Sequence, residues 1–177
     1  MNTQTLPERA GAITFRGKPM TLHGPELRVG DAAPDFTLTA AGLAPFTLAD
    51  ATAGGTRSAL LITVPSLDTP TCSVETSTFH TRLAEVPADV AAFVISADLP
   101  FAQARWAEAN AAGGLTYLSD YRDLGFAHAY GVAIKELALL ARAVFVVAKD
   151  GKIAYVQLVP EVASEPNYDA VFAAVKG

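Results

Sequence analysis

The only cysteine of the chain, Cys72, lies in the stretch "VPSLDTPTCSVET", where an apolar strand-like run gives way to a helical pattern. The run ends at Pro65, and Pro70 suits the first position of a helix, which makes Thr69 the expected N-cap residue. Cys72 then falls in the first helical turn, where unpaired N–H groups and the helix dipole stabilise an anion. A free thiol has a pKa of roughly 8.5, and such a position lowers that value. This setting favours a reactive thiolate.

Cys72 and Thr69 each have a structural interpretation besides the reactive one. Free cysteine is among the most buried residue types, and most such residues are inert packing. The flanking Thr71 and Ser73 and the strand-to-helix turn favour reactivity instead, because ligands of α/β sheets bind at the carboxyl ends of strands. The hydroxyl of Thr69 either faces the sulfur or caps its own helix, and the sequence leaves both possibilities open.

The composition excludes several other classes of protein. With 177 residues, 51% hydrophobic and 18% charged, we expect one globular domain over residues 1–177. The formal charge of -5 argues against nucleic acid as a partner, since phosphate binding needs excess Lys and Arg. The chain shows neither a long apolar run nor a secretory signal, so we expect a cytoplasmic protein without membrane contact. A single cysteine and scattered histidines predict no CxxC pair, no metal and no cofactor.

The order of patterns predicts an α/β fold with a mixed central sheet. We expect buried strands at 58–64 and 89–98, shorter strands at 35–38, 45–48 and 115–120, and a hairpin over 141–159. An N-terminal β-hairpin is expected over about residues 11–29, and helices are expected at 72–86, 100–110, 121–131 and 165–177. On the first of these helices, one buried face should hold Val74, Phe79, Leu83 and Val86.

Beyond these patterns, the chain resembles a known family. Pro65, Thr69 and Cys72 match the PxxxTxxC signature of the peroxiredoxins, the cysteine-dependent peroxidases. Nearly the whole chain is similar to the thiol peroxidase subfamily, through "ITFRGKPMTL", "SADLPFAQARW", "YGVAI", "LLARAVFVV" and "EPNYDA" in that order. The resemblance implies a thioredoxin-like fold with an N-terminal hairpin, usually in a homodimer. It also implies hydrogen peroxide or organic hydroperoxides as substrates, with thioredoxin or another thiol as reductant.

The resemblance implies a role for each of four residues. Cys72 would attack the terminal peroxide oxygen as a thiolate and become a sulfenic acid. Thr69 would hydrogen-bond the sulfur and the peroxide, Arg142 would stabilise the thiolate and polarise the O–O bond, and Pro65 would shield the sulfur from water. Without the resemblance, Arg142 is interpreted as a surface cation or part of a structural ion pair. Glu75 is expected to complement the helix dipole, with a bond to Arg142 as the alternative.

One position departs from the subfamily's pattern. Thiol peroxidases of this kind usually carry a second, resolving cysteine one residue beyond an aromatic, and here Ala107 follows Trp106. A sulfenic acid on Cys72 therefore has no second thiol within the chain. Three outcomes stay open: an external thiol reduces it, two Cys72 residues from different chains pair, or the alanine is an engineered replacement. The missing thiol also motivates an alternative function, a redox sensor that is oxidised once and recycled poorly.

Overall fold

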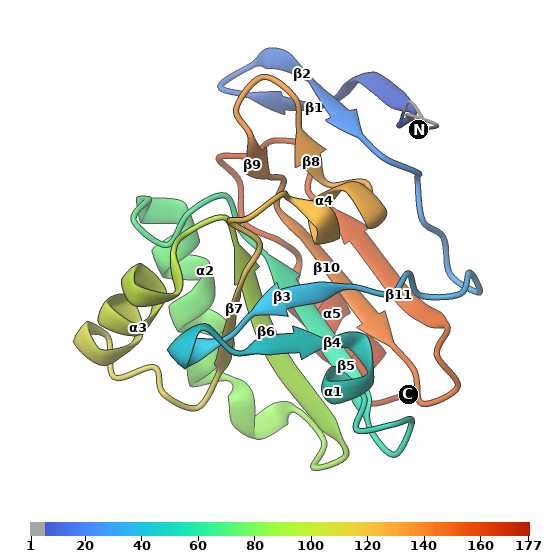
Figure 1. The fold of residues 1–177 in the computed structure, drawn as a ribbon, viewed down its shortest axis with the longest axis vertical. Helices are drawn as coiled ribbons and strands as arrows, with labels where there is room; N and C mark the ends of the chain where they lie inside the picture. The colour runs from blue at the N-terminus through green and yellow to red at the C-terminus, as the bar shows by residue number, and fades with distance from the viewer. Residues whose placement is uncertain (1–5) are drawn as a thin grey trace.

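The computed structural model describes residues 6–177, in which strands and helices alternate along most of the chain (Figure 1). The strands are β1 (Glu8–Phe15), β2 (Lys18–His23), β3 (Thr37–Thr39), β4 (Pro45–Thr47), β5 (Ser58–Thr63), β6 (Val90–Ser96), β7 (Thr116–Ser119), β8 (Ala133–Ile134), β9 (Leu139–Leu140), β10 (Ala143–Val147) and β11 (Ile153–Leu158). The helices are α1 (Leu48–Ala51), α2 (Pro70–Thr81), α3 (Pro100–Ala109), α4 (Gly125–Ala129) and α5 (Tyr168–Val175), with 3-10 turns at Ala41–Leu43 and Leu83–Glu85. No helix within this range is long and apolar enough to span a membrane.

Seven strands form one mixed sheet in the order β11-β10-β5-β6-β7-β3-β4. Strands β5, β6 and β7 run parallel, and the other neighbours pair antiparallel. Each parallel pair needs a crossover connection, and these connections contain α2 and α3. The predicted α/β class with a mixed sheet is confirmed. The loops that leave the carboxyl ends of β5 and β6 lead directly into α2 and α3.

A second sheet of four strands, in the order β1-β2-β8-β9, extends beyond the predicted N-terminal hairpin. Strands β8 and β9 have two residues each, too few to give a periodic pattern in the sequence. In the hairpin, the register shifts between Arg9 and Ile13, where Gly11 adopts a φ of 67° that suits a bulge. A Cβ on Gly24 would lie 2.0 Å from the carbonyl oxygen of His128, so only glycine allows this close approach. The base of the hairpin is thereby fixed beside α4.

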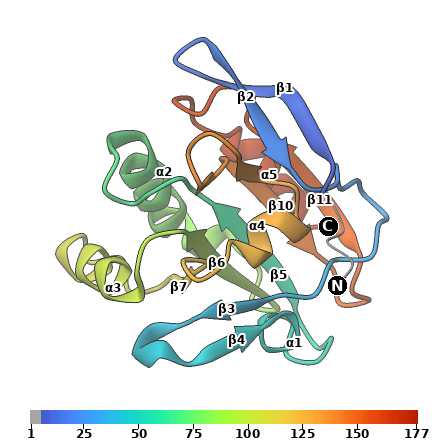
Figure 2. The same ribbon diagram turned by 45° about the horizontal axis from the view of Figure 1, so that its top comes forward.

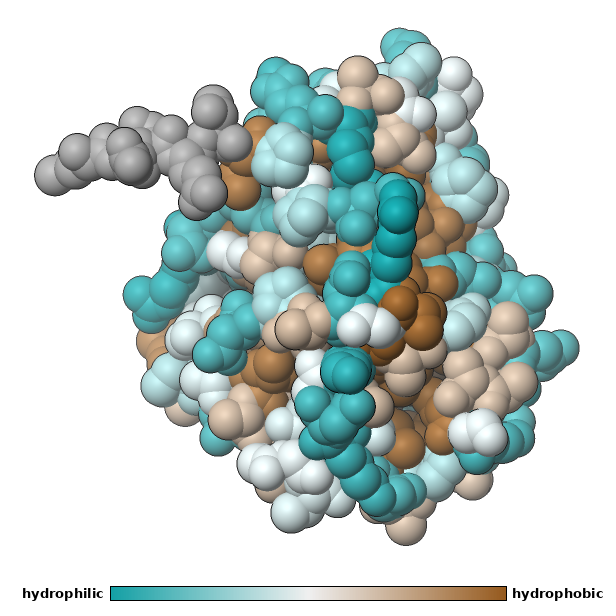
Figure 3. All heavy atoms as spheres, turned by 90° about the vertical axis from the view of Figure 1, so that its right-hand side faces the viewer, coloured by the Kyte–Doolittle hydropathy of each residue, from teal (hydrophilic) through white to brown (hydrophobic). Residues whose placement is uncertain are grey.

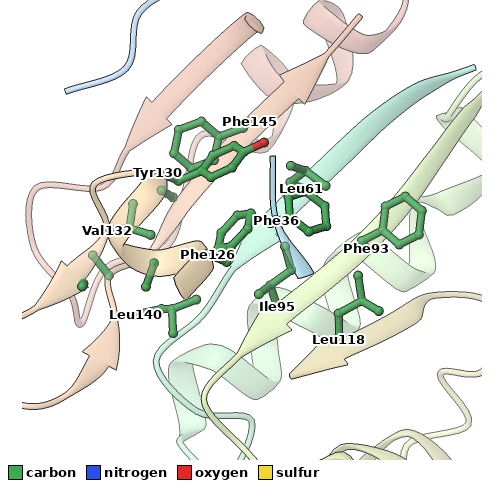
Figure 4. Close-up of a cluster of buried hydrophobic side chains, with 14 of the residues drawn as sticks. Phe36, Leu61, Phe93, Ile95, Leu118, Phe126, Tyr130, Val132, Leu140 and Phe145 are labelled. Carbon is green, nitrogen blue, oxygen red and sulfur yellow. The ribbon is translucent and has the colours of Figure 1, made fainter. Parts of the chain in front are cut away.

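The two faces of the seven-stranded sheet bury different groups of side chains. We call the first the α4 cluster; it joins the sheet to α1, α4 and the hairpin, and includes Leu61, Phe93, Phe126, Tyr130 and Phe145 (Figure 4). The second, the α2 cluster, joins the sheet to α2, α3 and α5, and includes Leu60, Ile62, Cys72, Phe79, Trp106, Val144 and Phe172. Figures 1 and 2 show α4 in front of the sheet and α5 behind it. The cysteine therefore belongs to the face that α2 covers.

The segment between β2 and β3 bonds the start of the edge strand β11. The N–H of Gly30 donates to the carbonyl of Ile153 (2.8 Å), whose own N–H donates to the carbonyl of Asp31 (2.9 Å). The N–H of Ala33 also donates to the carbonyl of Gly151 (2.9 Å). These bonds occupy backbone groups that an open edge would offer to another chain. Figure 3, which faces this edge, shows a band of hydrophilic residues crossing hydrophobic ones.

Candidate active site

Helix α2 carries Cys72 in its first turn, directly after the loop that follows β5. Thr69 is the N-cap residue with extended backbone angles, and Pro70 opens the helix, which confirms the predicted start. The N–H of Ser73 donates to the carbonyl of Thr69 at 3.0 Å. The Cys72 side chain has no exposed surface. The sulfur thus lies within protein at the end of the helix where backbone N–H groups lack helical partners.

The buried face of α2 differs from the predicted one. Val74 is 50% exposed, whereas the buried residues are Cys72, Glu75, Thr76 and Phe79. Their spacing places them on one side of the helix, but Phe79 is the only large hydrophobic residue among them. The prediction for Val74 was wrong because a buried ion pair at Glu75, described below, sets the rotation of α2 more strongly than a single valine does.

Arg142, directly before β10, brings a charged group to the sulfur. Its side chain is 1% exposed, so the interpretation as a surface cation is wrong. Its Nη2 donates to Cys72 Sγ at 3.4 Å and to the carbonyl oxygen of Val162 at 3.0 Å, and its Nε donates to the same carbonyl at 3.2 Å. Its Nη1 donates to Glu75 Oε2. Because β10 pairs with β5, the strand that precedes α2, the guanidinium reaches the sulfur from the neighbouring strand.

Glu75 is the buried partner of Arg142 and has no exposed surface. Its Oε1 has no hydrogen-bond partner among residues 6–177. Burial raises the pKa of Glu75 to about 7, although the charge and hydrogen bond of Arg142 act to lower it. Burial alone would lower the pKa of Arg142, but the charges of Glu75 and Cys72 raise it above its usual value. The guanidinium therefore stays charged beside the sulfur, and of the two roles considered for Glu75 the bond to Arg142 is the one observed.

The Thr69 hydroxyl is oriented by the loop backbone. Its Oγ1 donates to the carbonyl of Ser66 at 3.0 Å and makes no side-chain cap on α2. A hydroxyl whose proton is used in this way presents its lone pairs to other neighbours. Asp98 fixes the same loop, because its carboxylate accepts from the Ser66 hydroxyl (2.7 Å) and the Leu67 N–H (2.8 Å). Pro65, at the start of the loop, is buried.

Helix α3 packs against α2 through Trp106. The indole Nε1 donates to the hydroxyl of Ser73 at 3.2 Å, and the ring is 8% exposed. Ala107, the next residue of α3, is partly buried. The position at which the resemblance places a second cysteine thus lies on a helix that contacts the residue after Cys72.

The prediction from the sequence did not include two backbone groups that complete this arrangement. The carbonyl of Val162 accepts from Arg142, and the carbonyl of Ser66 accepts from Thr69. Every residue has a carbonyl, so no residue type or spacing could have singled these out. Within residues 6–177, no group of three His, Cys, Asp or Glu side chains is placed to hold a metal ion.

Comparison with known proteins identifies the family. Residues 28–172 match the redoxin family. The thiol peroxidase of Bacillus subtilis is 46% identical over 164 residues, which span 93% of this chain and 96% of that protein. The chain belongs to the thiol peroxidases of the redoxin family. A second thiol peroxidase, from Aquifex aeolicus, is 46% identical over 174 residues, which span 94% of this chain and 98% of that one.

Solved structures with a similar fold agree with the assignment of the chain to this family. A peroxiredoxin-like protein from Aquifex aeolicus superposes with a TM-score of 0.86 at 44% identity, covering 94% of this chain and 96% of the other. A thiol peroxidase from Chromobacterium violaceum gives a TM-score of 0.80 at 18% identity over 93% of this chain and 94% of the other, and at that identity it supports the fold alone. The thioredoxin-like fold and the peroxidase class inferred from the resemblance are confirmed.

Proposed function

We propose that this thiol peroxidase reduces hydrogen peroxide and organic hydroperoxides at Cys72, with electrons from an external thiol. The observation that carries the proposal is the hydrogen bond from Arg142 Nη2 to the sulfur, at 3.4 Å in the first turn of α2. A fixed guanidinium and free backbone N–H groups both favour the thiolate, which is the nucleophilic form of cysteine. The same positive charge would stabilise the negative charge that develops on the peroxide oxygens during attack.

In the first step, the thiolate of Cys72 attacks the terminal oxygen of a hydroperoxide, ROOH. The S–O bond forms while the O–O bond breaks, and RO⁻ leaves with the electron pair and takes a proton from solvent. The sulfur is oxidised to a sulfenic acid and the peroxide is reduced to an alcohol or to water. Since the hydroxyl of Thr69 donates its proton to the Ser66 carbonyl, its oxygen would accept a hydrogen bond from the O–H of the bound peroxide. Pro65 would limit the access of water to the sulfur.

In the second step, an external thiol attacks the sulfenic sulfur and releases water, leaving a mixed disulfide with Cys72. A second thiol then attacks the sulfur of the first, so that the two donors leave as a disulfide and Cys72 is released as a thiolate. Because Cys72 has no exposed surface, the protein around the sulfur must open before a peroxide or a thiol can reach it. The family resemblance supports thioredoxin or another thiol as the donor, a homodimer, and a cytoplasmic location.

The test is the intact mass of the reduced protein after one equivalent of hydrogen peroxide and then a thiol donor. We expect a rapid gain of one oxygen atom that the thiol reverses, and no gain in a Cys72→Ser variant. A disulfide-linked pair of chains would instead show that two subunits resolve each other. No change within seconds would contradict the proposal.

Steady-state turnover separates an enzyme from the redox-sensor alternative. An enzyme continues to consume peroxide while the thiol donor lasts, with each Cys72 oxidised many times. A sensor would consume about one equivalent of peroxide and then stop. Peroxide consumption measured against time, at a large excess of thiol over protein, distinguishes the two.

A further inference from the structure

The segment 161–163 joins three separate parts of the molecule through three consecutive residues. The carboxylate of Glu161 bonds the N-terminal hairpin. The carbonyl of Val162 accepts two N–H groups of Arg142. The carbonyl of Ala163 accepts the hydroxyl of Thr71, in the first turn of α2, at 3.4 Å. This short segment, which follows β11, therefore connects the hairpin to the surroundings of Cys72.

The carboxylate of Glu161 is surrounded by donors. Its Oε2 accepts from the Thr14 hydroxyl (2.7 Å) and the Gly17 N–H (3.2 Å), and its Oε1 accepts from the N–H groups of Arg16 and Ala163 (3.0 Å each). These bonds, that of Ala163 first, lower the pKa of Glu161 to about 2. The side chain is thus ionised across the range in which proteins are stable, and it bonds both the end of β1, at Thr14, and the turn that follows, at Arg16 and Gly17.

Backbone bonds continue this connection. The N–H of Thr14 donates to the carbonyl of Pro160 at 2.7 Å, and the N–H of Val162 donates to the carbonyl of Thr14 at 2.8 Å. The N–H of Val162 is therefore fixed by β1, while the next peptide presents the Val162 carbonyl to Arg142 and the Ala163 N–H to Glu161. Two of the five N–H donors of the guanidinium share that single carbonyl, so its direction, together with the Glu75 carboxylate, sets where the guanidinium lies.

We propose that Glu161 is a positioning residue for Arg142: by fixing segment 161–163 to the hairpin, it aims the Val162 carbonyl and so holds the guanidinium against Cys72. This inference rests on the proposed function, in which that guanidinium serves the thiolate. It assigns the N-terminal hairpin a part in the reaction, although the hairpin contributes no group that touches the sulfur. A displacement of about 1 Å at a reacting group can reduce a rate as much as a hundredfold.

Glu136, which also bonds the hairpin from another part of the chain, provides a matched control. The carboxylate of Glu136 accepts the N–H of Thr21, on β2, with both oxygens at 3.0 Å. Like Glu161, it is a side-chain acceptor that fixes the hairpin to the rest of the molecule. Unlike Glu161, it lies in the turn between β8 and β9 and not in the segment that bonds Arg142. Loss of either carboxylate loosens the hairpin, but only Glu161 belongs to the segment that carries the Val162 carbonyl.

The experiment compares Glu161→Ala and Glu136→Ala in the full chain, with Thr14→Val as a milder change that removes one donor to Glu161. For each we would measure the pH midpoint of iodoacetamide alkylation of Cys72, the second-order rate constant with hydrogen peroxide, and the thermal midpoint. We expect Glu161→Ala to move the alkylation midpoint upward and to slow the peroxide reaction about tenfold. Thr14→Val should shift both in the same direction by about twofold to threefold, and Glu136→Ala should leave both near wild type.

An unchanged alkylation profile in Glu161→Ala, or equal changes in the two alanine variants, would overturn the inference. If Glu161→Ala does not fold, the comparison of Thr14→Val with Glu136→Ala decides in the same way. Alkylation does not depend on peroxide turnover, so failure of the positioning role of Glu161 can be distinguished from failure of the proposed peroxidase function. A wild-type protein that peroxide does not oxidise would end the proposed function, while the alkylation midpoints would still test the position of Arg142.

Discussion

The α4 cluster and the α2 cluster line opposite faces of one sheet, and each encloses a buried carboxylate in a different way. Near α4, Asp120 is 3% exposed, and its two oxygens accept from the N–H groups of Phe126 and Ala127 at 3.1 and 2.8 Å. In the α2 cluster, Glu75 bonds Arg142 with one oxygen and leaves the other unpartnered among residues 6–177. Burial raises the pKa of both, to about 6 for Asp120 and about 7 for Glu75.

The difference indicates that the face with the α4 cluster is arranged for stability and the face with the α2 cluster is not. Asp120 satisfies the start of a helix, where unpaired N–H groups and the dipole compensate a negative charge. Glu75 holds a guanidinium in place, and a buried ion pair of this kind seldom stabilises a protein more than apolar residues of the same volume would. The α2 cluster thus retains costly charges because Arg142 must stand beside Cys72. Four predictions test this contrast, from the largest expected effect to the smallest.

Replacing Arg142 with methionine should have the largest effect, because it removes the charge at the sulfur and leaves Glu75 buried without a partner. We expect a loss of about 3–5 kcal/mol in the free energy of unfolding, and a fall of about 10²–10³-fold in the rate constant with peroxide. Urea denaturation and stopped-flow measurements report the two quantities. The double variant Arg142→Met, Glu75→Leu should regain most of the stability and none of the rate. Recovery of the rate in the double variant would contradict the contrast.

Replacing Phe126 with alanine should destabilise the protein by about 3–5 kcal/mol, since it removes a buried ring that stacks on Tyr130 in the α4 cluster. The effect on the peroxide rate constant should stay within about twofold at temperatures where the variant is folded. Denaturation and stopped-flow data on the same sample compare this variant directly with Arg142→Met. A large loss of rate here would mean that the two clusters are coupled through the sheet.

The pH dependence of stability should differ between the wild type and Glu75→Gln. Folding raises the pKa of Glu75 from 4.5 to about 7, so its contribution is fully present below pH 4.5 and is lost as the pH rises through 7. From pH 6 to pH 8 the wild type should therefore lose about 1.3 kcal/mol more than Glu75→Gln. Asp120→Asn is the control, because its window lies lower, from 3.8 to about 6. Parallel curves for wild type and Glu75→Gln would contradict this account.

The smallest effects should come from two changes on α2 that swap a hydroxyl for a methyl group or the reverse, one at buried Thr76 and one at the half-exposed Val74. The hydroxyl of Thr76 is buried without a hydrogen-bond partner among residues 6–177, so Thr76→Val should stabilise the protein by about 1 kcal/mol. The reciprocal change Val74→Thr alters a side chain that is 50% exposed and should stay within about 0.5 kcal/mol. Thermal unfolding of both variants measures the difference. A destabilised Thr76→Val would show that the hydroxyl has a bound partner, such as water.

Local signals made much of the fold predictable from the sequence. The apolar run of β5, the turn residues between β10 and β11, and Pro70 at the start of α2 each act within a few residues of themselves. The place of Cys72 in the first turn followed from Pro70 alone. Strands β8 and β9 were not predicted, because they form through pairing with the hairpin and have only two residues each.

The candidate site was less predictable because its bonds join residues far apart in the sequence. Arg142 entered the prediction through the family resemblance, since an arginine before a strand has no intrinsic preference for a sulfur 70 residues away. The exposure of Val74 could not be read from its hydrophobicity, because Glu75 and its partner decide which side of α2 is buried. Glu161 gave no signal at all, as its donors on the hairpin precede it by as many as 147 residues.

The distance between Cys72 and its guanidinium has a consequence for how the protein is made. Synthesis proceeds from the N-terminus, so Cys72 leaves the ribosome 70 residues before Arg142 and 90 residues before Val162. A nascent chain therefore carries its only cysteine as an ordinary thiol, without the cation that favours the thiolate. The reactive centre therefore forms only after residue 162 has been synthesised, when the sulfur, the guanidinium and the carbonyl that holds it can first come together.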